Sequence, residues 1–280
     1  MTWLLPHLFR LLAYLPLPLL HNLGALAGWV SWLSSPRYRR HLAENLRTAG
    51  LSQYKAGAIA EAGKALFELP HIWLRPRAEV LADIVRVAGW ETVEAALRGG
   101  RGIVFLTPHL GCFEITAQYY AAHHPITVLY RRPKQAWAEP LIAQGRGANF
   151  QLATADLAGV RQLLKTLKRG EAVGMLPDQV PGNGEGVWAP FWGRPAYTMT
   201  LAARLADTGA TVLLAYAERL PYGAGYNLRF LPLSQPLQGD LAARTAQLNG
   251  ELERLIRLCP TQYLWGYNRY KAPAGAPPKP

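Results

Sequence analysis

The stretch IVFLTPHLGCFE, Ile103 to Glu114, predicts a strand that turns into a helix, with a histidine at the turn. Its apolar start is rich in β-branched residues, which is typical of a buried strand. Thr107 and Pro108 end that run, and a helical pattern opens at Phe113. Open α/β sheets bind ligands beyond the carboxyl ends of their strands. His109 therefore stands where a functional group is expected.

His109 and Glu114 are the candidate catalytic residues. A histidine can remove a hydroxyl proton near neutral pH, and a carboxylate on its other ring nitrogen fixes the tautomer and stabilises the imidazolium. Five residues on one helix span about 140°, so the pair works only if His109 lies outside the helix. Pro108 and Gly111 permit this. A histidine that caps a helix or is satisfied in a core is the open alternative.

Strands and helices alternate along most of the chain, which predicts a mixed, mostly parallel sheet flanked by helices. The predicted strands are Ile84 to Val87, Ile103 to Leu106, Ile126 to Tyr130, Gln151 to Thr154, Ala172 to Leu176, Val212 to Glu218 and Tyr226 to Phe230. The predicted helices are Ala56 to Trp73, Glu91 to Leu97, Phe113 to His123, Gln135 to Gly145, Leu157 to Lys168, Thr198 to Asp207 and Leu241 to Arg257.

Composition narrows the class of partner. The 280 residues can bury a sizeable core, and 30 basic against 18 acidic residues give a net charge of +12. This charge favours an anionic partner: a nucleic acid, an anionic membrane or an acidic protein. The absence of a helix-turn-helix or RNP signature argues against nucleic acid. Cys112 and Cys259 are far apart and lack a CxxC spacing, which argues against a zinc site and a disulfide framework.

The N-terminus favours a membrane. Arg10 is the only charged residue among the first 36, and residues 1–35 form a predicted membrane-associated segment. Pro16 and Pro18 divide it into two stretches, Trp3 to Leu15 and Leu19 to Leu33, each shorter than the roughly 20 residues of a spanning helix. Either one kinked helix crosses the bilayer or two short helices lie in one leaflet. A hydrophobic helix buried in the core is the alternative.

Basic residues follow this segment in PRYRRHLAENLR, from Pro36 to Arg47, which indicates the cytoplasmic surface. Residues 36–271 are then expected to form a domain that faces the cytoplasm. The last residues, 272–280, have the composition of a disordered tail.

Two further strand ends carry candidate binding residues. Arg131, Arg132 and Lys134 follow the strand that ends at Tyr130, and such a basic cluster could hold phosphates, although solvated surface is an alternative. Asp178 and Gln179 follow another strand and open a long Gly- and Pro-rich loop with aromatic side chains. That loop could close over an apolar chain or meet a membrane, or its aromatics could pack inward.

These residues together resemble the lipid A biosynthesis acyltransferases, the late lauroyl- or myristoyl-type enzymes of lipopolysaccharide assembly. The resemblance rests on PRYRRHLAENL, HLGCFE, YRRPK, the PDQ loop with FWG, and the closing PTQYLWGYNRYK, so it covers nearly the whole chain. It implies a glycerolipid acyltransferase-like α/β fold and a bacterial inner-membrane enzyme. This enzyme would transfer a fatty acyl chain from acyl carrier protein to a hydroxyl of a 3-hydroxyacyl chain on a phosphorylated lipid A precursor.

The resemblance also implies roles for single residues. His109 would be the general base and Glu114 its orienting carboxylate, in the family's His-x4-Asp/Glu motif. Arg131 and Arg132 would lie near the phosphorylated acceptor or the donor's phosphopantetheine, and Asp178 and Gln179 would position substrate. No metal and no other cofactor is implied. The open alternatives are an acyltransferase for a lysophospholipid or another glycolipid, and a non-catalytic basic peripheral membrane protein.

Overall fold

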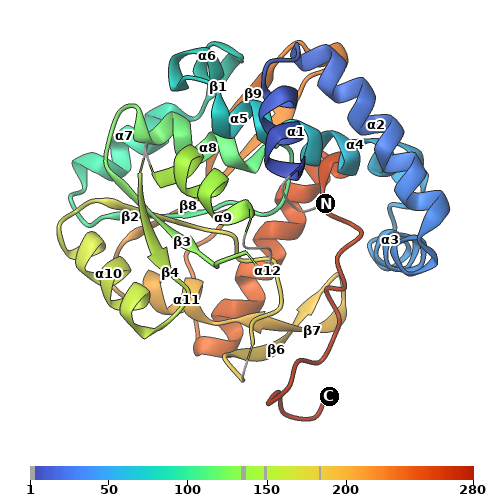
Figure 1. The fold of residues 1–280 in the computed structure, drawn as a ribbon. Helices are drawn as coiled ribbons and strands as arrows, with labels where there is room; N and C mark the ends of the chain where they lie inside the picture. The colour runs from blue at the N-terminus through green and yellow to red at the C-terminus, as the bar shows by residue number, and fades with distance from the viewer. Residues whose placement is uncertain (1–3, 134–136, 148–149, 183) are drawn as a thin grey trace.

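The computed structural model describes residues 4–133, 137–147, 150–182 and 184–280, and its centre is a seven-stranded sheet with helices on both faces (Figure 1). The strand order is β1-β9-β8-β2-β5-β3-β4. The pair β8–β9 is antiparallel, and every other neighbouring pair of this sheet is parallel. The strands are β1 (Ile84–Ala88), β2 (Ile103–Leu106), β3 (Ile126–Tyr130), β4 (Gln151–Thr154), β5 (Ala172–Met175), β8 (Thr211–Arg219) and β9 (Tyr226–Pro232). The predicted mixed, mostly parallel α/β architecture is confirmed.

The sheet divides the apolar core in two, because successive side chains of a strand point to opposite faces. In β2, Val104 and Leu106 face a core that α3, α4, α10, α11 and α12 complete, whereas Ile103 and Phe105 face a core completed mainly by α5, α6, α7 and α8. These helices are α3 (Pro36–Thr48), α4 (Lys55–Phe67), α5 (Leu69–Leu74), α6 (Arg77–Ala82), α7 (Trp90–Arg98), α8 (Phe113–Ala121), α10 (Leu157–Lys168), α11 (Leu201–Ala206) and α12 (Leu241–Leu258).

Two helices, α1 (Leu4–Ala13) and α2 (Leu17–Ser34), form the N-terminal part, and the break between them falls at the expected proline, Pro16. One face of α2 packs closely on α4: a Cβ added to Gly63 would lie 1.8 Å from the carbonyl oxygen of Gly24. The other face is apolar and exposed. Within the described ranges, none of the helices combines the length and the apolar character needed to span a membrane.

The stretch after Gln179 is an antiparallel hairpin and not the predicted long loop. Its strands are β6 (Gly186–Phe191) and β7 (Arg194–Met199), so the helix expected from Thr198 begins only at Leu201. The aromatics follow the inward-packing alternative: Phe191 and Trp192 are buried, and Trp188 is half-buried. Trp188 donates a hydrogen bond to the carbonyl oxygen of Pro277 at 2.9 Å. The disorder expected of residues 272–280 stays a prediction.

Two other predicted helices differ in detail. The helix expected over Ala56 to Trp73 is interrupted at Glu68 and forms α4 and α5. Part of the helix expected over Gln135 to Gly145 lies outside the described residues. Its described remainder is α9 (Ala138–Ile142), which continues into one turn of π-helix, η2 (Ala143–Gly147).

Candidate active site

The carboxyl ends of β2, β5, β3 and β4 meet at one edge of the sheet, because these parallel strands are neighbours. A groove of about 730 Å³ at this edge is lined by His109, Arg131, Arg146, Gln179 and a few apolar side chains. Arg131 and His109 thus line the same groove, and the roles of both residues stay predictions.

Asp178 orients His109. Its Oδ1 lies 2.8 Å from Nδ1 of the His109 ring, and its Oδ2 accepts the backbone N–H of His109 at 3.0 Å. Burial alone would raise the pKa of Asp178, but the attraction and hydrogen bonds of His109 together hold it below its usual value. The carboxylate is ionised and accepts only, so the proton belongs on Nδ1 and the lone pair is on Nε2.

Gln179 faces that base. Its amide nitrogen lies 3.2 Å from Nε2 of His109, the arrangement expected for an amide N–H that donates to a ring lone pair. The His109 side chain is 16% exposed, so a small polar group from the groove can reach Nε2.

Glu114 is buried in the first turn of α8, and its partner is Arg146. Arg146 donates to both carboxylate oxygens, with Nε at 2.8 Å from Oε2, and the Trp73 indole N–H donates to Oε2 at 3.1 Å. The structure therefore does not bring Glu114 and His109 together as the motif predicts. Glu114 turns toward α5, and Asp178, from the neighbouring strand end, makes the orienting contact. A catalytic role for Glu114 stays a prediction.

Arg146 is a site residue that the sequence reasoning missed. It lies in η2, whose Gly145 packs so closely on Trp73 that an added Cβ would lie 2.5 Å from the Trp73 Cβ. Burial alone would lower the pKa of Arg146, but Glu114 holds it above its usual value, so the guanidinium stays charged. The only sequence signal was a cation between two glycines, just beyond the predicted helix.

An apolar cavity extends from this pair into the core between the sheet and α8. Phe113, Glu114 and Arg146 lie at one end of its lining, and Tyr120 and Ile126 lie toward the opposite edge of the sheet. Arg146 and Leu176 line both this cavity and the groove beside His109. A narrow apolar space thus opens beside a base and a fixed positive charge.

The remaining predicted binding residues lie at the margin of the groove. Arg131 and Arg132 are exposed, and both line a shallow depression together with Asp156, at the start of α10. Arg132 lies 3.6 Å from Glu139. Lys134 falls outside the described residues.

Cys112 is fully buried, and burial raises its pKa well above the usual value, so it remains a packed thiol. In the described part of the chain, no three His, Cys, Asp or Glu side chains gather in a way that could hold a metal ion.

Comparison with known proteins points to one family. Residues 1–272 match the family described as bacterial lipid A biosynthesis acyltransferase. The chain is 27% identical over 289 residues to the lipid A biosynthesis lauroyltransferase of Escherichia coli (strain K12), which covers 99% of this chain and 94% of that protein. It is also 27% identical over 242 residues to the lipid A biosynthesis palmitoleoyltransferase of the same organism, covering 85% and 74% of the two chains.

A more distant relative has a different name. The phosphatidylinositol mannoside acyltransferase of Mycobacterium tuberculosis (strain ATCC 25618 / H37Rv) is 24% identical over 206 residues, which cover 71% of this chain and 64% of that protein.

Proposed function

Because this chain belongs to the bacterial lipid A biosynthesis acyltransferase family, we propose that it moves a fatty acyl chain from acyl carrier protein to a hydroxyl of a 3-hydroxyacyl chain on a lipid A precursor. Family membership supports acyl transfer in lipid A biosynthesis. The donor, the acceptor hydroxyl and the catalytic residues are the proposal.

The carrying observation is the fixed tautomer of His109. Its Nε2 takes the proton of the acceptor hydroxyl, and the oxygen attacks the thioester carbonyl carbon. The tetrahedral intermediate then breaks its C–S bond, which leaves the new ester and a thiolate on the donor. The thiolate receives the proton from Nε2 and leaves as a thiol. Asp178 stabilises the imidazolium between these two steps.

Arg146 and Glu114 act on the other reactant. The guanidinium lies where the apolar cavity meets the groove, so a thioester whose chain fills the cavity would bring its carbonyl oxygen near this charge. A fixed positive charge favours the negative charge that develops on that oxygen. Glu114 holds Arg146 in place through their hydrogen bonds. Under this proposal the HLGCFE motif supplies one residue to each half of the chemistry.

The rest of the edge suits the other parts of the two substrates. Arg131 and Arg132 are exposed at the groove margin and could contact a phosphate of the acceptor or of the donor's phosphopantetheine. Asp178 and Gln179 come from the same loop, which places substrate positioning and base orientation on one segment. A net charge of +12 suits an acidic carrier protein.

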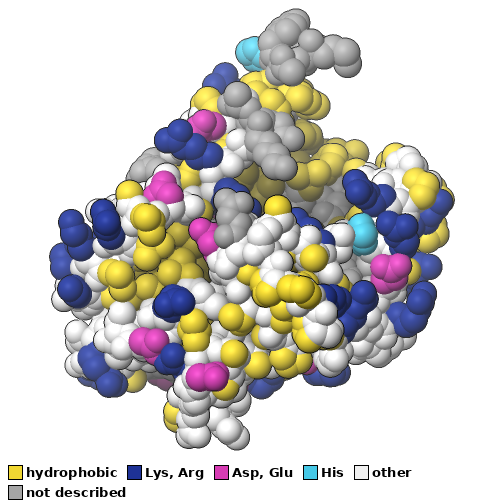
Figure 2. Space-filling model, turned by 90° about the horizontal axis from the view of Figure 1, so that it is seen from below, with side chains coloured by type: hydrophobic (Ala, Val, Ile, Leu, Met, Phe, Trp, Pro, Cys, Tyr) yellow, Lys and Arg dark blue, Asp and Glu magenta, His cyan; other side chains and the backbone are white. Residues whose placement is uncertain are grey.

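We further propose that α1 and α2 lie in the bilayer interface, at the cytoplasmic face of a bacterial inner membrane. The exposed face of these helices and of the turn between them carries large apolar side chains: Leu5, Leu8, Leu11, Tyr14, Leu19, Leu23, Leu26, Trp29, Val30 and Leu33. Exposed Arg37 and Arg40 follow at the start of α3, and Figure 2 shows apolar side chains near the upper edge of that view with Lys and Arg around the margins. Such an arrangement is typical of interfacial helices. Phe9 of α1 packs 5.7 Å from Trp73, so a lipid-bound α1 would bring the bilayer to the site.

A second candidate is an acyltransferase for another glycolipid or a lysophospholipid. The relative named for phosphatidylinositol mannoside favours it, because the His109 chemistry does not depend on the lipid that presents the hydroxyl.

An acyl-transfer assay tests both candidates. Purified wild-type, His109→Ala, Asp178→Asn and Glu114→Ala proteins in detergent are offered acyl carrier protein thioesters, with the lipid A precursor, lysophospholipids and mannosylated lipid as competing acceptors. We expect transfer to the lipid A precursor and a loss of about 10²- to 10⁴-fold in His109→Ala and in Asp178→Asn. Glu114→Ala is expected to lose turnover because Arg146 is released.

Each other outcome has a distinct meaning. Transfer only to another lipid would keep the mechanism and replace the acceptor. Full activity of His109→Ala would remove the proposed base. Folded wild-type protein that binds lipid and transfers to no acceptor would favour the non-catalytic membrane protein.

A further inference from the structure

The loop that carries His109 is held by main-chain hydrogen bonds on two sides. Leu264 N–H donates to the His109 carbonyl oxygen at 3.0 Å, and Gly111 N–H donates to the Gln262 carbonyl oxygen at 3.0 Å. On the other side, Cys112 N–H donates to the Ala217 carbonyl oxygen, near the end of β8, at 2.8 Å. The position of His109 therefore depends on how η4 (Pro260–Gln262) is fixed to β8.

Gln262 makes that connection. Its side-chain oxygen accepts the backbone N–H of Arg219 at 2.8 Å, and its amide nitrogen donates to the backbone carbonyl of Arg219 at 2.8 Å. One side chain thus bridges both main-chain groups of the last residue of β8, while its own carbonyl oxygen holds Gly111. Removing the amide would release η4 from the strand without touching a group that lines the groove.

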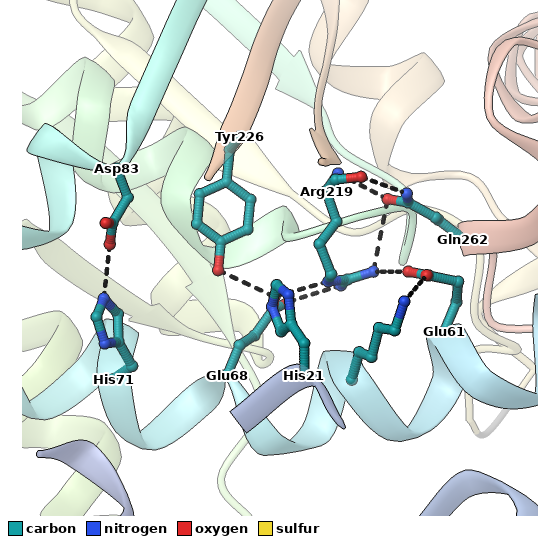
Figure 3. A network of polar contacts seen from close by, with 9 residues as sticks. His21, Glu61, Glu68, His71, Asp83, Arg219, Tyr226 and Gln262 are labelled. Carbon is teal, nitrogen blue, oxygen red and sulfur yellow. Dashed lines mark hydrogen bonds and ion pairs between the residues drawn. The ribbon is translucent and has the colours of Figure 1, made fainter. Parts of the chain in front are cut away.

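The Arg219 side chain is buried, and its charge is balanced by two glutamates (Figure 3). It donates to Glu68 at 2.7 and 2.6 Å and to Glu61 at 2.6 Å. The same guanidinium lies 3.5 Å from the Gln262 side-chain oxygen. A buried cation with paired carboxylates resists displacement, because moving it would leave charges unpaired. Arg219 is therefore a rigid anchor for the hydrogen bonds of Gln262.

The network continues to the N-terminal helices. His21, on the buried side of α2, lies 3.3 Å from Glu68, and the Tyr226 hydroxyl donates to Glu68 at 3.0 Å (Figure 3). Elements far apart in the sequence, α2, α4, β8, β9 and η4, thus meet around one buried arginine next to the His109 loop.

We propose that Arg219 and Gln262 are positioning residues for His109, which set the place of its imidazole through the backbone of residues 109–112. Neither side chain lines the groove or the apolar cavity, so neither is a catalytic residue. The inference rests on the proposed function insofar as His109 is the base.

The test is Gln262→Met, which keeps the length of the side chain and removes both side-chain hydrogen bonds. Gln247→Met is the matched control, because Gln247, on α12, makes the same reciprocal pair of hydrogen bonds with the backbone of Gln238. We expect kcat for acyl transfer to fall about 10- to 100-fold in Gln262→Met with KM within about twofold of wild type, since a small displacement of a catalytic group has an effect of this size. Gln262→Glu, which keeps the acceptor for Arg219, should give an intermediate kcat.

Two further measurements separate positioning from folding. Melting temperatures correct each kcat for unfolded protein, and the imidazole ¹H–¹⁵N signals of His109, assigned by their loss in His109→Gln, report its hydrogen bond to Asp178. These signals should move in Gln262→Met and stay in Gln247→Met. They are read in the full chain without substrate, so they test the inference even if wild-type protein transfers to no acceptor.

The inference is overturned if the folded fraction of Gln262→Met keeps the kcat of Gln247→Met, or if the His109 signals do not move. A rise in KM at unchanged kcat would also overturn it, because that pattern belongs to a substrate contact.

Discussion

The Asp178 carboxylate makes two hydrogen bonds to His109, one to the imidazole ring and one to the main chain. Because it accepts both the main-chain N–H and Nδ1 of His109, the loop and the imidazole are held by the same group. Glu114 meanwhile holds Arg146, a cation that lines both the apolar cavity and the groove beside His109. Under the proposed function the two carboxylates have separate tasks: Asp178 prepares the base for the hydroxyl, and Glu114 holds the charge for the thioester oxygen.

Glu68 gives the fold a specific dependence on acid. Burial alone would raise its pKa, but Arg219 and His21 together lower it to about 2 from its ordinary 4.5. The folded pKa lies below the unfolded one, so the stabilisation is complete above pH 4.5 and is lost as pH falls toward 2. We expect this one group to contribute on the order of 3 kcal/mol to the free energy of unfolding at neutral pH.

Urea unfolding of wild type and Glu68→Gln at several values between pH 6 and pH 3 measures this contribution. Wild type should lose stability more steeply with acid than Glu68→Gln, which has no carboxylate to protonate. Asp83→Asn is the control, since the neighbouring His71–Asp83 pair, at 2.6 Å, is separate from the Arg219 network (Figure 3). Parallel curves for wild type and Glu68→Gln would contradict the assignment.

The sequence pointed to His109, the proposed base, but not to its partner. His109 could be predicted from the sequence because a histidine after a buried strand is a local signal. Asp178 lies 69 positions away, and its contact depends on β5 lying beside β2, a strand order that local patterns do not carry. Arg146 was missed for the same reason, because its pairing with Glu114 spans 32 positions.

At the scale of elements, the space inside the apolar cavity depends on a glycine in β5. A Cβ added to Gly174 would meet Ile126 and Val128 side-chain carbons at 3.4 Å, on the side of the sheet that faces α8. Gly174→Ala should be tolerated, and the larger Gly174→Val should shorten the space. We expect Gly174→Val to shift the preferred thioester to a shorter chain and to lower kcat/KM for the wild type's preferred chain about tenfold.

A competition assay with thioesters of graded chain length measures this preference. Tyr120→Phe is the control, because it lines the same cavity and loses only a buried hydroxyl that has no hydrogen-bond partner among the described residues. An unchanged preference in folded Gly174→Val would show that the chain lies elsewhere.

The predicted elements have a local sequence signal, whereas the missed ones depend on tertiary contacts. Buried parallel strands such as β2 and β3 are short apolar runs, and their bounds match the predicted ranges. The β6–β7 hairpin contains prolines and glycines that normally indicate a loop. It is a strand pair because its side chains pack on α12: Asn249 donates to the Pro190 carbonyl at 2.9 Å and lies 3.1 Å from the Thr198 hydroxyl.

At the scale of the whole molecule, α1 and α2 give the protein one apolar side. The buried face of α2 packs on α4 through glycines, and the large apolar side chains of the opposite face are exposed among the residues that the structure describes. The apolar side chains there are contiguous along α2, because Leu26, Val30 and Leu33 recur at helical spacing. Single exposed leucines are common on soluble proteins, but a continuous face followed by arginines supports the proposed membrane interface.

Leu26→Glu tests that interface. Leu26 is 63% exposed and lies in the middle of the face, so burying a carboxylate in place of an isobutyl group should weaken binding to vesicles of anionic lipid at least tenfold, consistent with roughly 1.5–3 kcal/mol for a buried leucine. Co-sedimentation measures the bound fraction. Leu157→Glu is the matched control, because Leu157 is 78% exposed on α10, which lies far from α1 and α2 (Figure 1). Added salt should weaken wild-type binding only in part, since apolar burial does not depend on charge screening. Equal losses in both variants would mean that added charge alone repels the vesicles, and no loss in either would place the membrane contact on another face.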